Sequence, residues 1–309
     1  NRRLHHSLSG TDFSRPDNRL VRSRNLRSLP PDVYLVQDAQ AMRVRLPAIL
    51  LSLCLVWSCS FDRTFFPADE RPDEITGADQ EIVVLRAADG KNIHHVMVKP
   101  RSSPKATIFV LHGSGSKVSN WLNLLQPLID DRYQLFLMEY RGFGRSEGEP
   151  SHEAVTSDAH RAFLYLAARD DVRDKPILVL GQSYGGQIAV NLAARFDDDV
   201  DVLVTEGAFT SFRDIAVYST PWFAKPFTWT VFRNPYSSME LIKKTSTPKL
   251  IIHSQDDEVV PFLMGERLYA SARGKKEFWK THGKHADALV DYPQEFVSRL
   301  NEIVELKHD

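Results

Sequence analysis

The chain has 309 residues, of which 42% are hydrophobic and 26% are charged. A chain of this length and apolar content can bury one large α/β core. Its 39 basic and 40 acidic residues give a formal net charge of -1. This balance excludes an interaction driven by strong charge, such as general binding to nucleic acid.

The first 41 residues differ in composition from the rest of the chain. They contain seven Arg but neither Lys nor Glu, and they show no hydrophobic periodicity. Met42 then opens a short basic segment, which the apolar residues 46–57 and the small residue Ser58 follow. This order is typical of a secretory signal peptide, and the apolar run is shorter than the about 20 residues that a membrane-spanning helix needs. We therefore expect residues 1–41 to be disordered or non-native and residues 42–58 to be a signal peptide.

Cys59 directly follows residues 56–58, a sequence similar to the bacterial lipoprotein box in which signal removal leaves a lipidated cysteine. By analogy with bacterial sorting, Ser60 rather than Asp after this cysteine favours the outer membrane. The predicted location is the bacterial cell envelope, as an outer-membrane lipoprotein facing the periplasm. A periplasmic protein and an inner-membrane anchor are the alternatives. Residues 59–79 would form the tether to the folded domain.

Apolar runs and helical periodicity alternate from residue 80 to the C-terminus. The first two strands are expected to form a hairpin through residues 88–90. The later strands alternate with helices, which is typical of a mostly parallel sheet with helices on both faces. The folded domain therefore extends over residues 80–309. Strands are expected at 81–86, 93–99, 106–111, 134–139, 177–181, 201–205, 249–253 and 276–280, and helices at 151–169, 186–196, 262–273 and 293–306.

The sequence Gly-Gln-Ser-Tyr-Gly-Gly at residues 181–186 lies between an apolar run and a helix-like segment. A serine in such a strand–turn–helix is held in a strained conformation with its hydroxyl exposed. Gly181 and Gly185, two positions either side of Ser183, let the strand and the helix pass closely. Ser183 is therefore a candidate nucleophile.

A nucleophilic serine needs a base and an acid that orients the base. Two carboxylates, Asp256 and Asp257, follow the apolar strand at 249–253, where catalytic loops lie in open α/β sheets. Two histidines, His282 and His285, follow the last strand. The chain order is therefore Ser, Asp, His, which is the order found in the α/β-hydrolase triad.

These motifs together resemble those of the α/β-hydrolases, in the branch similar to serine aminopeptidases, lysophospholipases and monoacylglycerol lipases. Residues 109–114 are similar to the family's strand-3 His-Gly loop, and residues 140–146 to its strand-4 turn. The resemblance covers residue 80 to the C-terminus. It implies an α/β-hydrolase fold with a mostly parallel eight-stranded sheet, helices on both faces and a short lid after strand 6.

The resemblance also selects between neighbouring residues. The family pattern His-Gly-x-x-Asp-x-x-Val-Pro places the acid at Asp257 rather than Asp256, with Ser254 in place of the usual glycine. The pattern Gly-x-x-His followed by a small residue and Asp selects His285 over His282. The implied catalytic residues are Ser183, Asp257 and His285.

An oxyanion formed at Ser183 needs two N–H donors. One is expected from the backbone of Tyr184, the residue after the nucleophile. The resemblance points to the backbone of Ser114 for the other, in a loop that Gly113 and Gly115 allow to turn inward.

The remaining histidines and loops indicate no cofactor. His112 and His253 end strands and are expected to bind loop backbone. No histidine has a Cys or a second His at ligand spacing, so no metal site is predicted. The loop after residue 111 lacks the Gly-Lys-Ser/Thr ending of a phosphate-binding loop. The expected chemistry needs no cofactor.

Residues 208–247 form the predicted lid, which is rich in aromatic and basic side chains and carries Asp214 and Glu240 as its acidic residues. Such a lid suits an acyl chain with an anionic head group, and it also suits contact with a membrane surface. The alternative is that the rings pack the lid onto the body.

The resemblance implies a serine hydrolase that cleaves a small-molecule carboxylic ester, similar to an esterase or lysophospholipase, through an acyl-enzyme. A peptidase or amidase with the same triad is one alternative, although a lid poor in acidic groups disfavours it. A non-catalytic envelope lipoprotein is the other. It is disfavoured because each triad position carries a chemically competent residue. The expected partners are the acyl ester and, through a lipidated N-terminus, a membrane surface, without nucleic acid.

Overall fold

The computed structural model describes residues 79–114, 121, 124–232 and 234–305. The predicted signal peptide, the lipidation site Cys59 and almost all of the tether lie outside the described residues and stay predictions. No helix in the described part of the chain is long and apolar enough to cross a membrane.

Eight strands form one sheet in the order β1-β2-β4-β3-β5-β6-β7-β8. β1 pairs antiparallel with β2, and β2 pairs antiparallel with β4, whereas all the later pairs are parallel. The predicted fold class is confirmed. The strands are β1 (Gln80–Arg86), β2 (Asn92–Val98), β3 (Ala106–Leu111), β4 (Tyr133–Met138), β5 (Ile177–Gln182), β6 (Val202–Glu206), β7 (Lys249–Ser254) and β8 (Lys276–Thr281).

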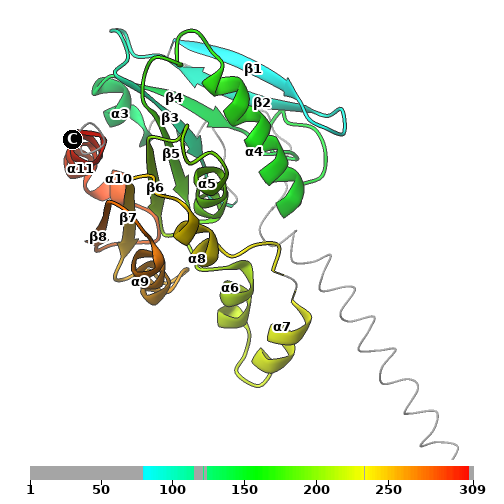
Figure 1. Cartoon of the computed structure of the whole chain (residues 1–309). Coiled ribbons are helices and arrows are strands. Elements are labelled where there is room, and N and C mark those ends of the chain that lie inside the picture. Colours follow the sequence, from blue (N-terminus) through cyan, green and yellow to red (C-terminus); the bar gives the residue numbers. More distant parts are fainter. Residues whose placement is uncertain (1–78, 115–120, 122–123, 233, 306–309) are drawn as a thin grey trace, which may run out of the picture. The chain divides into compact units, whose positions relative to one another are not determined.

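Helices cover both faces of this sheet (Figure 1). One face packs against α4 (His152–Ala167), α5 (Tyr184–Arg195) and α9 (Phe262–Ser271). The other face packs against α3 (Gln126–Asp130), α10 (Ala288–Asp291) and α11 (Pro293–Glu305). α3 and α10 were not expected, because four or five residues are too few to show a helical period.

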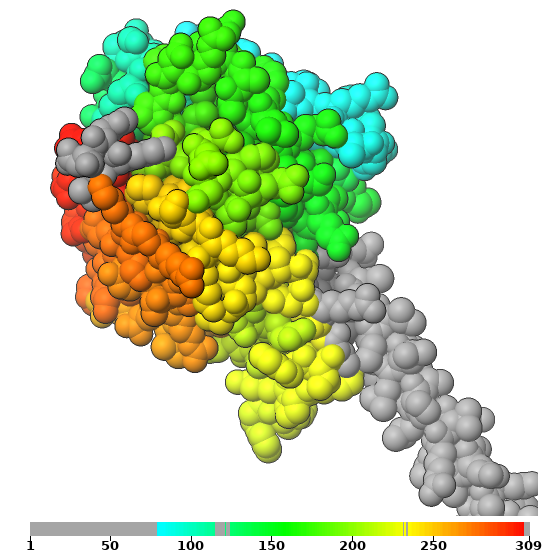
Figure 2. Space-filling view, in the orientation of Figure 1, coloured from blue at the N-terminus to red at the C-terminus, as the bar shows by residue number. Residues whose placement is uncertain are grey.

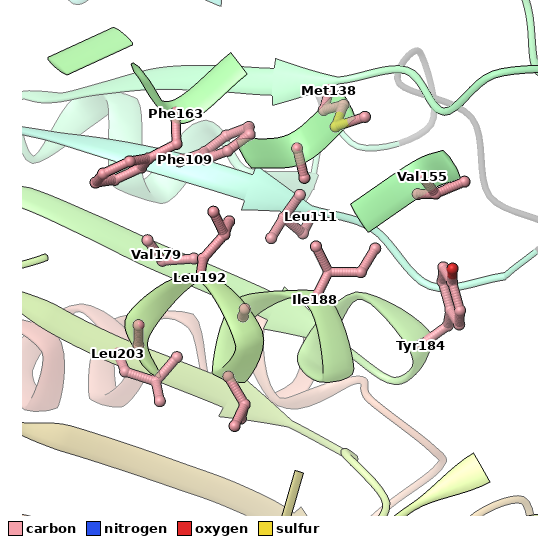
Figure 3. Packing of buried hydrophobic residues seen from close by; sticks show 14 of the residues in the cluster. Phe109, Leu111, Met138, Val155, Phe163, Val179, Tyr184, Ile188, Leu192 and Leu203 are labelled. Atoms are coloured by element: carbon pink, nitrogen blue, oxygen red, sulfur yellow. The ribbon is translucent and has the colours of Figure 1, made fainter. Parts of the chain in front are cut away.

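Side chains that alternate along each strand supply the two cores. In β3, Phe109 and Leu111 join the cluster under α4 and α5, whereas Ile108 and Val110 join the cluster under α11. Figure 3 shows the first cluster, in which Phe109 and Leu111 meet side chains of both helices. Truncating a fully buried ring such as Phe109 to Ala would cost about 3–5 kcal/mol.

The chain between β6 and β7 forms a short helical segment with α6 (Phe212–Ser219), α7 (Lys225–Val231), α8 (Ser238–Leu241) and the 3-10 helix η1 (Ile242–Lys244). The Ser211 side chain caps α6 by accepting a 3.1 Å hydrogen bond from Asp214 N–H.

Residues 212–236 form a loop whose ends meet. An isolated antiparallel bridge joins Ser211 to Ser237, directly outside these residues. Figure 2 shows α6 and α7 projecting from the body of the domain.

Candidate active site

Ser183 lies at the turn between β5 and α5, with φ of +53° and ψ of -116°. A positive φ in a residue other than glycine costs about 1–3 kcal/mol, and such strain clusters at functional sites. A Cβ at Gly181 would lie 2.6 Å from the Cβ of Ala189, and one at Gly185 would lie 2.7 Å from His112 O. The expectation that both neighbouring positions require glycine is therefore confirmed.

Main-chain contacts hold this turn against the next strand. Ser183 N–H donates to Glu206 O at 2.8 Å, and Gly186 N–H donates to Ser183 O at 3.0 Å. The buried Tyr184 ring packs edge-on to Tyr140, with centroids 5.8 Å apart. The strained serine is thus fixed from both sides.

Asp257 and His285 form a hydrogen-bonded pair that is largely shielded from solvent. His285 Nδ1 donates to Asp257 Oδ2 at 2.6 Å, and the Asp257 side chain is 0% exposed and that of His285 17%. Asp257 Oδ1 accepts from Val259 N–H at 2.9 Å and from Val260 N–H at 2.8 Å. Burial alone would raise the pKa of Asp257, but hydrogen bonds from His253, His285 and the backbone outweigh it and hold the pKa well below its ordinary value. Asp257 is therefore ionised at neutral pH.

His253, on β7, contacts the same carboxylate from the other side. Its Nε2 lies 3.0 Å from Val260 O and 3.4 Å from Asp257 Oδ2. The expected bond to loop backbone is confirmed. The contact with Asp257 was not foreseen, because it depends on how the loop folds back over the strand end.

Asp256 and His282, the two residues that the family pattern did not select, form a pair of their own. His282 Nδ1 lies 3.0 Å from Asp256 Oδ2, and both side chains are exposed. Two Asp–His pairs therefore lie side by side in sequence, and the selected pair is the buried one.

His285 and Ser183 both lie close to the end of β6. A Cβ at Gly207 would lie 2.8 Å from His285 Cε1, and Ser183 is bonded to Glu206, the residue before this glycine. His285 Nε2 is buried and has no hydrogen-bond partner among the described residues. This is the ring nitrogen that a general base would use.

The loop after β3 lies beside Ser183. A Cβ at Gly113 would lie 3.5 Å from Ser183 Cβ, and Ser114 follows in an exposed turn. His112 braces this loop, since its Nδ1 lies 2.7 Å from Gly113 O and its carbonyl accepts from Tyr140 Oη at 2.8 Å. Burial lowers the pKa of His112 to about 4, so the ring is neutral, and its expected structural role is confirmed.

Glu206 and Gln182 also lie near this site and were not among the predicted site residues. Glu206 Oε1 accepts from Ala288 N–H at 2.6 Å, and Oε2 accepts from Gln182 Nε2 at 3.2 Å. Gln182 Nε2 also donates to Ala286 O. Their contact could have been predicted from the sequence. Gln182 and Glu206 end adjacent parallel strands, so they lie next to each other at the carboxyl ends of these strands.

The turn after β4 is anchored by a buried ion pair. Arg141 donates to both oxygens of Asp158, at 2.7 and 2.9 Å, and to Asp89 Oδ2 at 3.0 Å. This pairing fixes the turn against α4. Among the described residues, no group of three or more His, Cys, Asp or Glu could hold a metal ion.

A family model described as the alpha/beta hydrolase fold matches residues 106–237. The uncharacterized protein YfhR of Salmonella typhi is 30% identical over 242 residues, which cover 73% of this chain and 81% of that protein. The chain belongs to the α/β-hydrolase family. At the level of class, it is a hydrolase.

A lipase matches this chain in sequence, and an esterase matches it in fold. The lysophosphatidylserine lipase ABHD12 of Danio rerio is 35% identical over 193 residues, which are 58% of this chain and 50% of that protein. The solved structure of the Pyrococcus furiosus esterase Pf2001 aligns with a TM-score of 0.61 at 16% identity, over 77% of this chain and 98% of that one. At this identity, the second likeness shows the fold alone.

Proposed function

We propose that this α/β-hydrolase cleaves a carboxylic ester through an acyl-enzyme formed on Ser183. The observation that carries the proposal is the buried Asp257–His285 pair, whose free Nε2 lies at the sheet edge that holds the strained serine. Neither a binding module nor a structural domain needs a buried carboxylate that orients an imidazole in this way.

The reaction proceeds in two steps. Ser183 Oγ attacks the ester carbonyl while His285 Nε2 takes its proton, and the same proton then goes to the alcohol that leaves. Water then attacks the acyl-enzyme with His285 as base. The bond between the acyl carbon and Ser183 Oγ breaks, the carboxylic acid leaves, and His285 returns the proton to Ser183 Oγ. Asp257 holds Nδ1 protonated and stabilises the imidazolium, because it stays ionised through both steps.

The oxyanion formed in each step is held by the backbone N–H groups of Tyr184 and Ser114. Tyr184 begins α5, so its N–H lies at the positive end of the helix. Ser114 follows Gly113, which approaches Ser183 closely. Removing one such donor typically costs about 3–4 kcal/mol of transition-state stabilisation.

The small number of acidic residues in the lid favours an ester substrate over a substrate with a free amine. Its two acidic residues are already engaged, since Asp214 accepts from Thr210 Oγ1 at 2.6 Å and Glu240 accepts from Lys243 Nζ at 2.6 Å. A lid with only these two acidic residues, each already paired, offers little to bind a substrate ammonium group.

The lid aromatics divide into two groups, so neither sequence-based interpretation holds for all of them. Phe209 and Phe212 are buried against the body. The exposed rings suit the acyl chain of an amphiphilic ester, in line with the ABHD12 relative, which is a lysophosphatidylserine lipase. They are Tyr218, Trp222, Phe223, Phe227 and Trp229.

A fluorophosphonate probe tests the nucleophile. The wild-type protein should be labelled, Ser183→Ala should not, and Ser157→Ala, which changes a serine on α4, should be labelled as the wild type is. Absence of wild-type labelling in a folded protein would favour the non-catalytic alternative.

The ester assignment needs a separate comparison. A panel of p-nitrophenyl esters of increasing acyl length is measured beside aminoacyl p-nitroanilides. Ester turnover with little anilide turnover is expected, and the reverse preference would assign a peptidase or amidase.

We also propose the envelope location and the lipidation of Cys59, on the signal-like sequence alone. Mass spectrometry of the mature N-terminus tests both. A diacylated Cys59 is expected, and an unmodified terminus further along the chain would contradict the anchor.

A further inference from the structure

Glu206 closes β6 directly before Gly207, the residue that packs against the His285 ring. Its side chain is buried although it is a carboxylate. Burying an ionised carboxylate is unfavourable unless hydrogen bonds or opposite charges stabilise it. The position of Glu206 beside the proposed base therefore requires a structural explanation.

The hydrogen bonds of Glu206 match its ionised form. Oε1 accepts from Ala288 N–H and Oε2 accepts from Gln182 Nε2. A protonated carboxyl would need an acceptor for its own O–H, whereas both of these partners are donors. These two contacts therefore favour the ionised form of Glu206.

The same contacts fix the chain that carries His285. Ala286, the next residue, has φ of +58°, a left-handed conformation that is unfavourable for a residue with a Cβ. Gln182 Nε2 holds the carbonyl of Ala286, and Glu206 holds the N–H of Ala288. Two adjacent strand ends therefore clamp the loop on the C-terminal side of His285.

The charges that face Glu206 come from this loop. Burial raises the pKa of Glu206 above its ordinary value, and Asp287 adds to that effect. The Ala288 N–H, the Gln182 amide and the positive form of His285 act in the opposite direction. His285 also faces Asp257, which lies in the loop after β7.

We propose that Glu206 is a second carboxylate that acts on His285, by positioning its loop and by favouring the imidazolium that forms when Ser183 gives up its proton. This inference rests on the proposed function. The proton passes from Ser183 Oγ to His285 Nε2 and then to the leaving alcohol. Glu206 stays ionised throughout and touches no substrate, so it is a positioning residue.

The test is an NMR titration of the imidazoles in the full chain labelled with ¹³C-histidine, with the His285 signal assigned from its loss in His285→Gln. In Glu206→Gln, the midpoint of His285 should fall by about one pH unit, because a neutral amide no longer favours the imidazolium. Glu206→Asp, which keeps the charge, should shift it less. Asp256→Asn is the control for an exposed nearby charge, and its midpoint should stay close to that of the wild type.

Ester kinetics on the same variants supply the second readout. In Glu206→Gln, kcat should fall about tenfold, which is the rate equivalent of one pKa unit. KM should change less than about twofold, and the acid limb of kcat/KM should move to lower pH. A merely structural role would lower kcat without moving this limb.

An unmoved His285 midpoint in folded Glu206→Gln would overturn the proposal, whatever happens to kcat. The titration needs no turnover, so it is independent of the proposed function: an inactive wild type with a moved midpoint would contradict the ester hydrolase alone.

If Glu206→Gln does not fold, the coupling is measured from the other side, since linkage between two titrating groups is reciprocal. The Glu206 carboxyl carbon is titrated in the wild type and in His285→Gln. Its midpoint should rise when the imidazolium is removed, and an equal midpoint in both proteins would overturn the proposal.

Discussion

His282 binds Asp256 through a 3.0 Å contact between Nδ1 and Oδ2. This pair is as well formed as many catalytic ones, but its side chains are 65% and 60% exposed. Water screens such a pair and competes for its hydrogen bonds. The pair formed by Asp257 and His285 is buried, and burial is what lets one carboxylate fix the tautomer of a base.

Changing each aspartate to asparagine compares the two pairs directly. Asp257→Asn should lower kcat by about 10⁴-fold, the effect of losing the orienting acid in a serine triad. Asp256→Asn should stay within about twofold of the wild type, because it changes an exposed pair. Steady-state ester kinetics give both values. Equal losses would mean that the acid is not assigned correctly.

Gly207 offers a test of the proposed position of His285. In Gly207→Ala, the new Cβ would meet the His285 ring at 2.8 Å, and a misplaced base should cost kcat about 100-fold. Gly90→Ala is the matched control, since it also places a side chain at positive φ, but it meets Arg86 at 3.6 Å and is far from the site along the sheet. Both variants should melt at lower temperature, and normal kcat in Gly207→Ala would contradict this geometry.

His95 should make stability depend on pH. Burial lowers its pKa to about 4 in the folded protein, against 6.5 in a solvated histidine. The unfolded chain therefore binds more protons between these values, so the stabilisation is fully present above about pH 6.5 and is lost as the pH falls to about 4. The difference corresponds to roughly 3 kcal/mol.

The variant His95→Phe keeps a ring that can stack on Phe136. Its free energy of unfolding in urea should fall less between pH 7 and pH 4.5 than that of the wild type. Some pH dependence should remain, because burial also lowers the pKa of His112 and of His152 to about 4. Identical slopes in the two proteins would exclude His95 as a contributor.

The ion pair of Arg141 and Asp158 should contribute to stability. Asp158→Ala leaves a buried guanidinium without its main partner, which should cost about 3–5 kcal/mol in urea unfolding. Asp89→Ala removes the exposed partner of the same arginine and should cost less than about 1 kcal/mol. Similar losses in both variants would show that burial does not separate these contacts.

The sheet and the elbow could be predicted because their signals are local. All eight expected strands occur within one residue of their expected ends, and Gly181 and Gly185 are required by contacts inside a single strand–turn–helix. The choice of His285 over His282 needed the family pattern, since both follow the same strand. Burial, which separates them, is a property of the folded chain.

The contact of Glu206 with Ala288 could not be predicted in the same way, unlike its contact with Gln182 on the adjacent strand. This contact joins residues 82 positions apart, and hydrophobic periodicity gives no information on contacts between residues so far apart in the sequence. The lid was equally ambiguous, because the buried Phe212 and the exposed Trp222 are both aromatic residues in one segment. Which of these rings is buried depends on how the segment packs against the rest of the domain.

The bridge between Ser211 and Ser237 closes residues 212–236 at its base. Because the two ends meet, this stretch can be lengthened, shortened or exchanged between homologous enzymes without moving β6 or β7, the strands on either side of it. Selection can therefore alter which molecules such a protein accepts while its chemistry stays constant. A chimaera that carries residues 212–236 of another family member should take on the substrate preference of that protein and keep the catalytic residues of the host.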